Sequence, residues 1–374
     1  MEKIKINAVQ LFALIILFEF GSALVVGVGM EAEKDAWLAV LLGLACGMAM
    51  FIVHGTLHRF FPNLLFTSYI QKILGKYIGW PIALLYTAYF MNAAARNLRD
   101  CSNLLNIALY DLTPLFVLNL SMTLVVAYLI YKGIEVLART ASIYFMILII
   151  IGVIGTIVLF SSRIIHVPNL LPILEKGYKP VLLTVPQTYF FPFAEMLAFS
   201  MVLPYLNKPK QGIPIGLWAM MVSGAILSYT VALDVGVLGV NIVSRTPIPL
   251  YTALSKVGIG DFLQRIDVIV MFALIIGNFF KVAIYYYISV IAAADLFKVE
   301  KHHKLVFPFG VTILFSSIII SSNFSEHITE GLQVIQFVSI PFQTGIPILL
   351  LVVTLFRRRL RNTASDRTPS NSDT

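Results

Sequence analysis

Several ionisable side chains stand inside apolar stretches of this sequence, and the strongest candidates for a function are Glu19, Glu195 and Lys281. An ionised group at the centre of a membrane helix costs about 2.5–3.5 kcal/mol on insertion scales, so such residues are functional candidates by default. A carboxylate there can bind an amine, carry a proton or hold a helix end by accepting backbone hydrogen bonds. These chemistries stay open for both glutamates, as does the structural alternative of a carboxylate satisfied at a helix end.

Lys281 needs an acidic partner, a water-filled cavity or a lowered pKa if it lies at bilayer depth. Asp267 is fourteen residues earlier, about four helical turns away, and cannot reach it. The partner must then come from another segment, as Glu19, Glu195 or Asp234, unless the amine extends to the membrane surface. Asn278 and Tyr285 are three and four residues from Lys281, so the three can share one helix face.

The composition indicates the elements that position these residues. Of 374 residues, 59% are hydrophobic and 12% are charged, and the mean hydropathy is +0.88. Soluble proteins have about 25% charged residues, so the composition excludes a cytosolic enzyme, a nucleic-acid-binding protein and a disordered chain. Runs of about 20 apolar residues mark membrane spans. The sequence contains ten: 6–30, 36–58, 79–108, 113–131, 141–161, 181–206, 213–241, 266–294, 305–322 and 333–356.

Basic residues predict the orientation of these spans. With both ends in the cytoplasm, inner segments hold seventeen Lys and Arg residues and outer segments hold nine, as the positive-inside rule requires. The expected domain is therefore a transmembrane unit over residues 1–360, with halves at about 6–161 and 181–356. Residues 361–374 are expected to form a disordered cytoplasmic tail. The stretch 66–73 between spans two and three is expected to form a short interfacial helix.

Two spans are interrupted near their middles. Span one contains Gly21-Ser22-Ala23, and span six contains Phe191-Pro192-Phe193-Ala194-Glu195. They are the first and sixth of ten, so they cross the bilayer in opposite directions. Paired interrupted spans point to a transporter-type binding site, because an unwound segment frees backbone groups that a small zwitterion can meet. The alternative is that Gly and Pro are simply common in membrane helices.

Span three carries a polar stripe, Asn92, Arg96 and Arg99, with Asp100 four residues after Arg96. The stripe is either an outer gate or the solvated outer end of the helix, and the solvated end is the preferred interpretation. The sequence contains no phosphate-binding glycine loop, ATPase motif or Cys/His cluster. An enzyme, a cofactor and a metal site are therefore not expected.

Four stretches together resemble the spore germination permease family, the B subunits of GerA-type nutrient germinant receptors. They are Ile4–Phe12, Phe66–Lys76, Asn92–Asp100 and Phe190–Glu195. That family is a branch of the amino acid–polyamine–organocation superfamily, and the resemblance covers roughly residues 5–356. It implies an all-α integral membrane fold with ten helices in a five-plus-five inverted repeat, in which helices one and six are broken.

The resemblance also implies a function and a site. The expected protein lies in the endospore inner membrane, binds a small germinant, commonly an amino acid, and triggers germination with A and C subunits. The candidate binding residues are Gly21, Ser22, Ala23, Asn92, Phe193, Ala194, Glu195, Asn278 and Tyr285. Superfamily members often keep a sodium ion between spans one and eight, so Lys281 is a candidate to replace that ion, with Glu19 as a second coupling candidate.

The residues leave competing functions open. A sensor, in which ligand binding is transmitted to partner subunits, needs the same pocket as a proton-coupled amino acid permease. A structural scaffold with a vestigial pocket is a third possibility.

Overall fold

Helices make up the fold, which was obtained as a computed structural model that describes residues 5–257, 267–321, 326–327, 330–331 and 335–365. Within these ranges there is no β-strand, only an isolated bridge between Ile6 and Leu206. Five helices are long and apolar enough to cross a membrane, and three more apolar helices are shorter. Each of the ten predicted spans overlaps helical structure, and the chain is a multi-pass membrane protein.

Span one breaks where the sequence predicted. Helix α1 (Ala8–Phe20) begins at a capping box between Asn7 and Gln10 and ends at Gly21. Gly21 has a φ of 32°, which a residue with a Cβ rarely adopts. The chain then follows turns to the 3₁₀ helix η1 (Met30–Asp35). The expected span 6–30 is therefore helical only in its first half.

The segments that follow η1, as far as span five, form helices in the order expected. Helix α3 coincides with the expected short helix at 66–73, and α6 begins seven residues before its predicted span. The helices are α2 (Ala36–Phe60), α3 (Phe66–Leu74), α4 (Lys76–Ala108), α5 (Leu115–Tyr131) and α6 (Ile134–Ser161).

Span six contains the second break. Helix α7 (Lys179–Phe190) ends before Phe191 and Pro192, and the 3₁₀ helices η3 (Phe193–Met201) and η4 (Leu203–Tyr205) follow. The remaining helices are α8 (Gly212–Leu238), α9 (Val240–Val243), α10 (Pro249–Ser255), α11 (Asp267–Leu296), α12 (His303–Ile319), the π-helix η6 (Ile335–Gly345) and α14 (Ile346–Ser365), with short 3₁₀ turns η2 (Val167–Leu170) and η5 (Pro209–Gln211).

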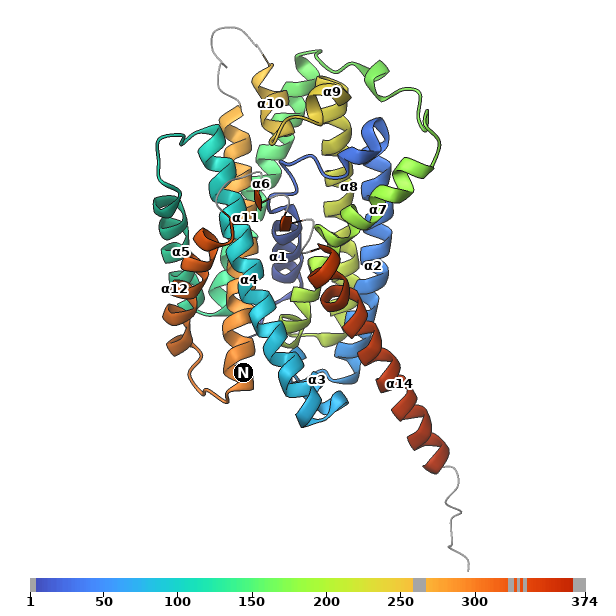
Figure 1. The fold of residues 1–374 in the computed structure, drawn as a ribbon, viewed down its shortest axis with the longest axis vertical. Coiled ribbons are helices and arrows are strands. Elements are labelled where there is room, and N and C mark those ends of the chain that lie inside the picture. Colours follow the sequence, from blue (N-terminus) through green and yellow to red (C-terminus); the bar gives the residue numbers. More distant parts are fainter. Residues whose placement is uncertain (1–4, 258–266, 322–325, 328–329, 332–334, 366–374) are drawn as a thin grey trace, which may run out of the picture.

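The two broken spans are central and joined. Helix α1 packs against α6, α8 and α11 and lies in the middle of the bundle (Figure 1). Its residues 13–20 are at most 2% exposed. At its start, the Ile6 amide donates to the Tyr205 carbonyl at 2.8 Å, and the Asn207 amide donates to the Ile6 carbonyl at 3.0 Å. The start of span one is thus tied to the end of span six.

The last helix extends away from the bundle. In Figure 1, α14 projects beyond α3 at the lower end of the molecule. It runs to Ser365, past the expected start of the tail at residue 361. The rest of the expected tail, 366–374, lies outside the described residues.

Candidate ligand-binding site

A cavity of about 660 Å³ lies at the two breaks. Ser22 from span one and Glu195 from span six both line it, together with Asn92 from α4. Its other lining residues include the side-chain amides Asn97, Gln187 and Gln343, the aromatic residues Tyr89, Phe190 and Phe191, and the ionisable residues Arg96, Asp100, Arg245 and His327. Residues from both breaks therefore line one cavity.

Lys281 links the two breaks. Its ammonium forms an ion pair with the Glu195 carboxylate, and its side chain is fully buried while that of Glu195 is 13% exposed. The ammonium also lies 5.5 Å from the centre of the Phe18 ring and 4.5 Å from the centre of the Phe191 ring. These are cation–π distances. A single cation thus contacts both broken spans, and Glu195 is its partner among the three carboxylates that the sequence offered.

The absence of side chains at two glycines permits this arrangement. A Cβ on Gly21 would lie 2.6 Å from Cδ of Lys281, and a Cβ on Gly277 would lie 3.0 Å from the backbone N and O of Gly21. Both distances are shorter than van der Waals contact. Helix α11 can therefore approach the span-one break closely enough for the lysine stem to cross it.

Glu19 lies on the side of α1 that faces α8, away from the cavity. It is fully buried and accepts a hydrogen bond from the Ser223 hydroxyl on α8. It does not line the cavity. The same Ser223 hydroxyl lies 2.9 Å from the Ala219 carbonyl oxygen and 3.1 Å from the Met220 carbonyl oxygen of α8. The structure thus separates Glu19, which faces α8, from Glu195, which faces the chamber.

The other candidate residues of spans one, six and eight are buried and do not line the cavity. Phe193 packs against α2, where a Cβ on Gly47 would lie 2.4 Å from Cβ of Phe193. Asn278 donates to the Leu274 carbonyl at 3.3 Å, and the Tyr285 ring lies 5.1 Å from the Phe18 ring. The buried candidates that do not line the cavity are Gly21, Ala23, Phe193, Ala194, Asn278 and Tyr285.

The preferred interpretation of the span-three stripe, a solvated helix end, is wrong for Arg99, whereas Asn92 is exposed. Arg99 is 4% exposed and donates to the Ser321 carbonyl at 2.9 Å. Asp100 does not pair with Arg96. It contacts His327 at 2.6 Å, while Arg96 lies 3.9 Å from Glu330. This end of α4 is therefore covered by the chain that follows α12, and that chain supplies His327 to the cavity.

The last span holds a third interruption that the sequence interpretation missed. The π-helix η6 contributes Ser339 and Gln343 to the cavity. Gln343 donates to the Tyr89 hydroxyl at 2.7 Å, and the Phe342 and Tyr89 rings stack at 5.3 Å. π-Helical segments are rare and are frequently found at functional sites. Pro341, with polar residues inside an apolar run, was the available signal.

Comparison with known proteins places this arrangement in a family. A family model described as "Spore germination protein" matches residues 5–325. The chain belongs to the spore germination permease family. Spore germination protein KB of Bacillus subtilis (strain 168) is 40% identical over 363 residues, which cover 96% of this chain and 97% of that protein. Spore germination protein YndE of the same organism is 25% identical, covering 87% and 89%.

A solved structure shares the fold of the present chain. It is Mhp1, a nucleobase-cation-symport-1 family transporter, in a closed conformation with bromovinylhydantoin bound. The TM-score is 0.66 at 12% identity, over 92% of this chain and 78% of that chain. The fold is therefore the inverted-repeat transporter fold with broken spans, which the resemblance implied.

Proposed function

We propose that this chain is a nutrient germinant receptor subunit that binds a small germinant, an amino acid, in the cavity at the two breaks. The observation that carries the proposal is the Lys281–Glu195 ion pair, which joins the broken spans at the wall of that cavity. A ligand that changes this pair changes the contact between spans one and six. Binding and conformational change are thereby connected through one interaction.

The chemistry of the cavity suits a zwitterion. The ligand ammonium can compete with Lys281 for the Glu195 carboxylate. The ligand carboxylate can accept hydrogen bonds from the side-chain amides and from backbone N–H groups freed at the breaks. Asn92, Gln187 and Gln343 support this assignment, because their side-chain amides line the cavity.

A germinant acts by favouring one of two arrangements of the broken spans. A ligand shifts an equilibrium only by its difference in affinity for the two states. A shift from about 1% to about 99% active needs about 5.5 kcal/mol. In the state where Lys281 and Glu195 are paired, a ligand that takes Glu195 leaves a buried partner unpaired, at a cost of about 3–5 kcal/mol. The ligand therefore binds better to a state in which the pair is already apart, and this difference in affinity is of the order required.

The proposed setting is the inner membrane of the endospore, where the chain works with A and C subunits. Its support is family membership, since the relatives are spore germination proteins. In this setting the partner subunits detect the new arrangement of spans one and six, and the chain itself carries out no net transport.

A proton-coupled amino acid permease is the second candidate. It is favoured by the fold shared with a transporter and by a buried carboxylate on the cavity wall. In that function Glu195 would carry the coupling proton, and substrate would cross the membrane through the same chamber.

One experiment separates the two candidates. Spores lacking this gene and complemented spores are screened for germination with single amino acids, and the active amino acid is then offered, labelled, to proteoliposomes containing this chain alone. The receptor proposal expects binding without accumulation under a pH gradient. Sustained uptake driven by the gradient would support the permease instead.

Substitution of Glu195 tests the site. Glu195→Gln removes the charge that meets the ligand ammonium, so the germinant concentration needed should rise about 10- to 100-fold, the value of a charged hydrogen bond. Glu300→Gln, at an exposed carboxylate in an inner loop, is the control. A normal germinant response with Glu195→Gln in a folded receptor would contradict the site and favour the scaffold.

A further inference from the structure

A second cavity, of about 330 Å³, lies between α6, α8, α10 and α11. We call it the α6 groove. It shares no lining residue with the candidate ligand-binding site. Its walls include Gly152 and Gly155 of α6, Leu254 of α10 and Ala273 of α11.

The α6 groove is lined almost entirely by hydrocarbon. Its polar lining atoms belong to Thr156, Tyr229 and Thr230. Thr230 donates to the Ile226 carbonyl of its own helix at 2.9 Å, and the Tyr229 hydroxyl lies 3.5 Å from the Thr156 hydroxyl. Water needs two to four polar partners to stay in a cavity, and a polar ligand would lose its hydration without replacement. The occupant must therefore be apolar.

The surface around the α6 groove is the surface that faces lipid. Ile150, Ile154 and Ile157 on α6 are 59%, 44% and 59% exposed. Only 17% of the apolar window of this helix is buried within the protein. In a membrane, hydrocarbon chains cover such a surface and are continuous with any apolar groove in it. A methylene group is close in size to a water molecule, at about 30 Å³, so the groove holds about ten methylenes.

The deep wall of the α6 groove belongs to the span-one break. Phe20 and Leu24, which flank Gly21-Ser22-Ala23, both line it. Phe20 is 2% exposed. Because an empty apolar cavity forfeits dispersion contacts along its walls, a chain in the groove stabilises the packing on this side of the break.

We propose that the α6 groove binds one acyl chain of a membrane phospholipid, and that this chain packs against Phe20 and Leu24. The broken segment is then supported on one side by protein and on the other by lipid. This lipid site does not depend on which germinant the chain binds.

The test is photo-crosslinking in nanodiscs. The purified chain is reconstituted with a phosphatidylglycerol that carries a diazirine midway along one acyl chain, and the labelled residues are mapped by mass spectrometry. Label at Phe20 and Leu24 is expected, because only a chain inside the groove reaches them. Label restricted to the exposed face of α6 would overturn the proposal.

Filling the α6 groove should remove that label. In Gly155→Phe the new Cβ lies 3.8 Å from Cδ2 of Leu254, an ordinary contact, so the ring can enter the groove. Label at Phe20 and Leu24 should fall about tenfold, as expected when room for roughly two methylenes is lost. Gly152→Phe, whose Cβ meets nothing within 4 Å, is the second variant should the first fail to fold.

The control is Ile154→Phe, which adds a ring on the same helix outside the groove. It should leave the label at Phe20 and Leu24 unchanged. Retention of full label in both folded glycine variants would overturn the proposal. So would loss of the label when partner subunits are present, since a protein helix would then occupy the groove.

Discussion

The ammonium group of Lys281 is fully buried, and Glu195 is the carboxylate that pairs with it. Lys281→Met should destabilise the protein by about 3–5 kcal/mol, because it leaves Glu195 as an unpaired charge in the membrane interior. The double variant Lys281→Met/Glu195→Gln should recover part of that loss, since no isolated charge remains. Thermal unfolding of the purified variants in detergent measures both effects.

A lysine in the turn that follows the same helix provides the control. Lys298 is 75% exposed, and its amine lies 3.5 Å from Asp295. An exposed pair contributes about 0–1 kcal/mol, so Lys298→Met should change stability little. Equal losses for Lys281→Met and Lys298→Met would mean that the Lys281–Glu195 pair has no special role.

Glycine at the crossing of α1 and α11 is an element-scale requirement. Gly277→Ala places a methyl group 3.0 Å from the backbone of Gly21, which cannot rotate away. It should lower the free energy of unfolding by about 1–3 kcal/mol, the usual cost of overpacking. Gly152→Ala meets open space and should be neutral or slightly stabilising, since Ala favours helix more than Gly does. Thermal unfolding of both variants is the comparison.

Helix α3 is held to the end of α11 by one carboxylate. Asp295 accepts hydrogen bonds from the Thr67 hydroxyl at 2.6 Å and from the Ser68 hydroxyl at 2.7 and 2.9 Å. Asp295→Ala should therefore release the start of α3 and speed amide hydrogen exchange over residues 66–74. Lys298→Ala should leave that exchange unchanged. Unaltered protection in Asp295→Ala would show that apolar packing alone holds α3.

The sequence revealed elements better than contacts. Hydropathy located the spans, and Gly21 and Pro192 marked the breaks to within a residue or two, because backbone chemistry is local. The partner of Lys281 remained one of three carboxylates, since periodicity orders residues along one helix and says nothing about which helix lies opposite. The contact between His327 and Asp100 was missed for the same reason, because the two residues are far apart in the chain. The π-helix η6 is different, since Pro341 was a local signal for it.

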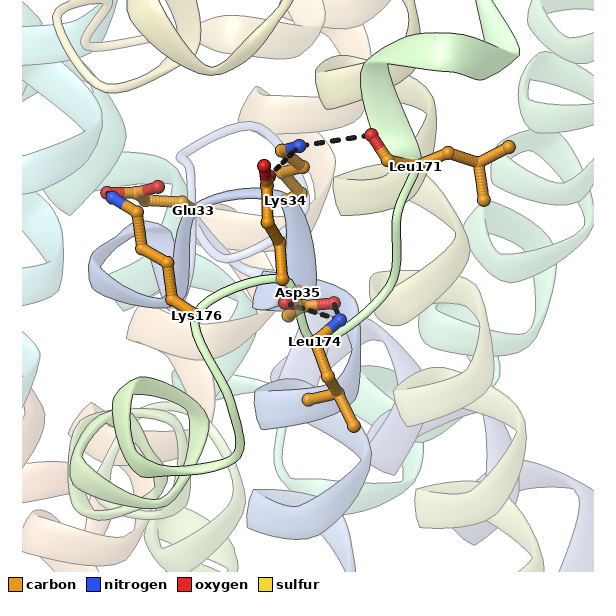
Figure 2. A network of polar contacts seen from close by, with 7 residues as sticks. Glu33, Lys34, Asp35, Leu171, Leu174 and Lys176 are labelled. Atoms are coloured by element: carbon orange, nitrogen blue, oxygen red, sulfur yellow. Dashed lines mark hydrogen bonds and ion pairs between the residues drawn. The ribbon is translucent and has the colours of Figure 1, made fainter.

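At the scale of the whole molecule, a clamp formed by Glu33, Lys34 and Asp35 with residues 171–176 joins the two broken spans at the ends opposite the Ile6–Leu206 bridge. Figure 2 shows η1, which follows span one, against the loop that precedes span six. Lys34 pairs with Glu175, Lys176 contacts Glu33 at 2.6 Å, and both Asp35 oxygens accept from the Leu174 amide at 3.1 Å. If either span moves, these contacts must therefore break, or the segment on the other side of the clamp must move with it.

The clamp should weaken in acid and in salt. The hydrogen bond and charge of Lys34 hold the pKa of Glu175 below its usual 4.5. Because the folded-state pKa is the lower one, the stabilisation is complete above about pH 4.5 and is lost as pH falls through the folded value. Amide exchange of residues 171–176 should accordingly stay slow at neutral pH and speed up in acid, after correction for intrinsic rates. High salt should have a similar effect at neutral pH, since the Debye length falls to about 3 Å at 1 M. Glu175→Gln should flatten both dependences, and an unchanged acid response in that variant would show that the Lys34–Glu175 pair is not its source.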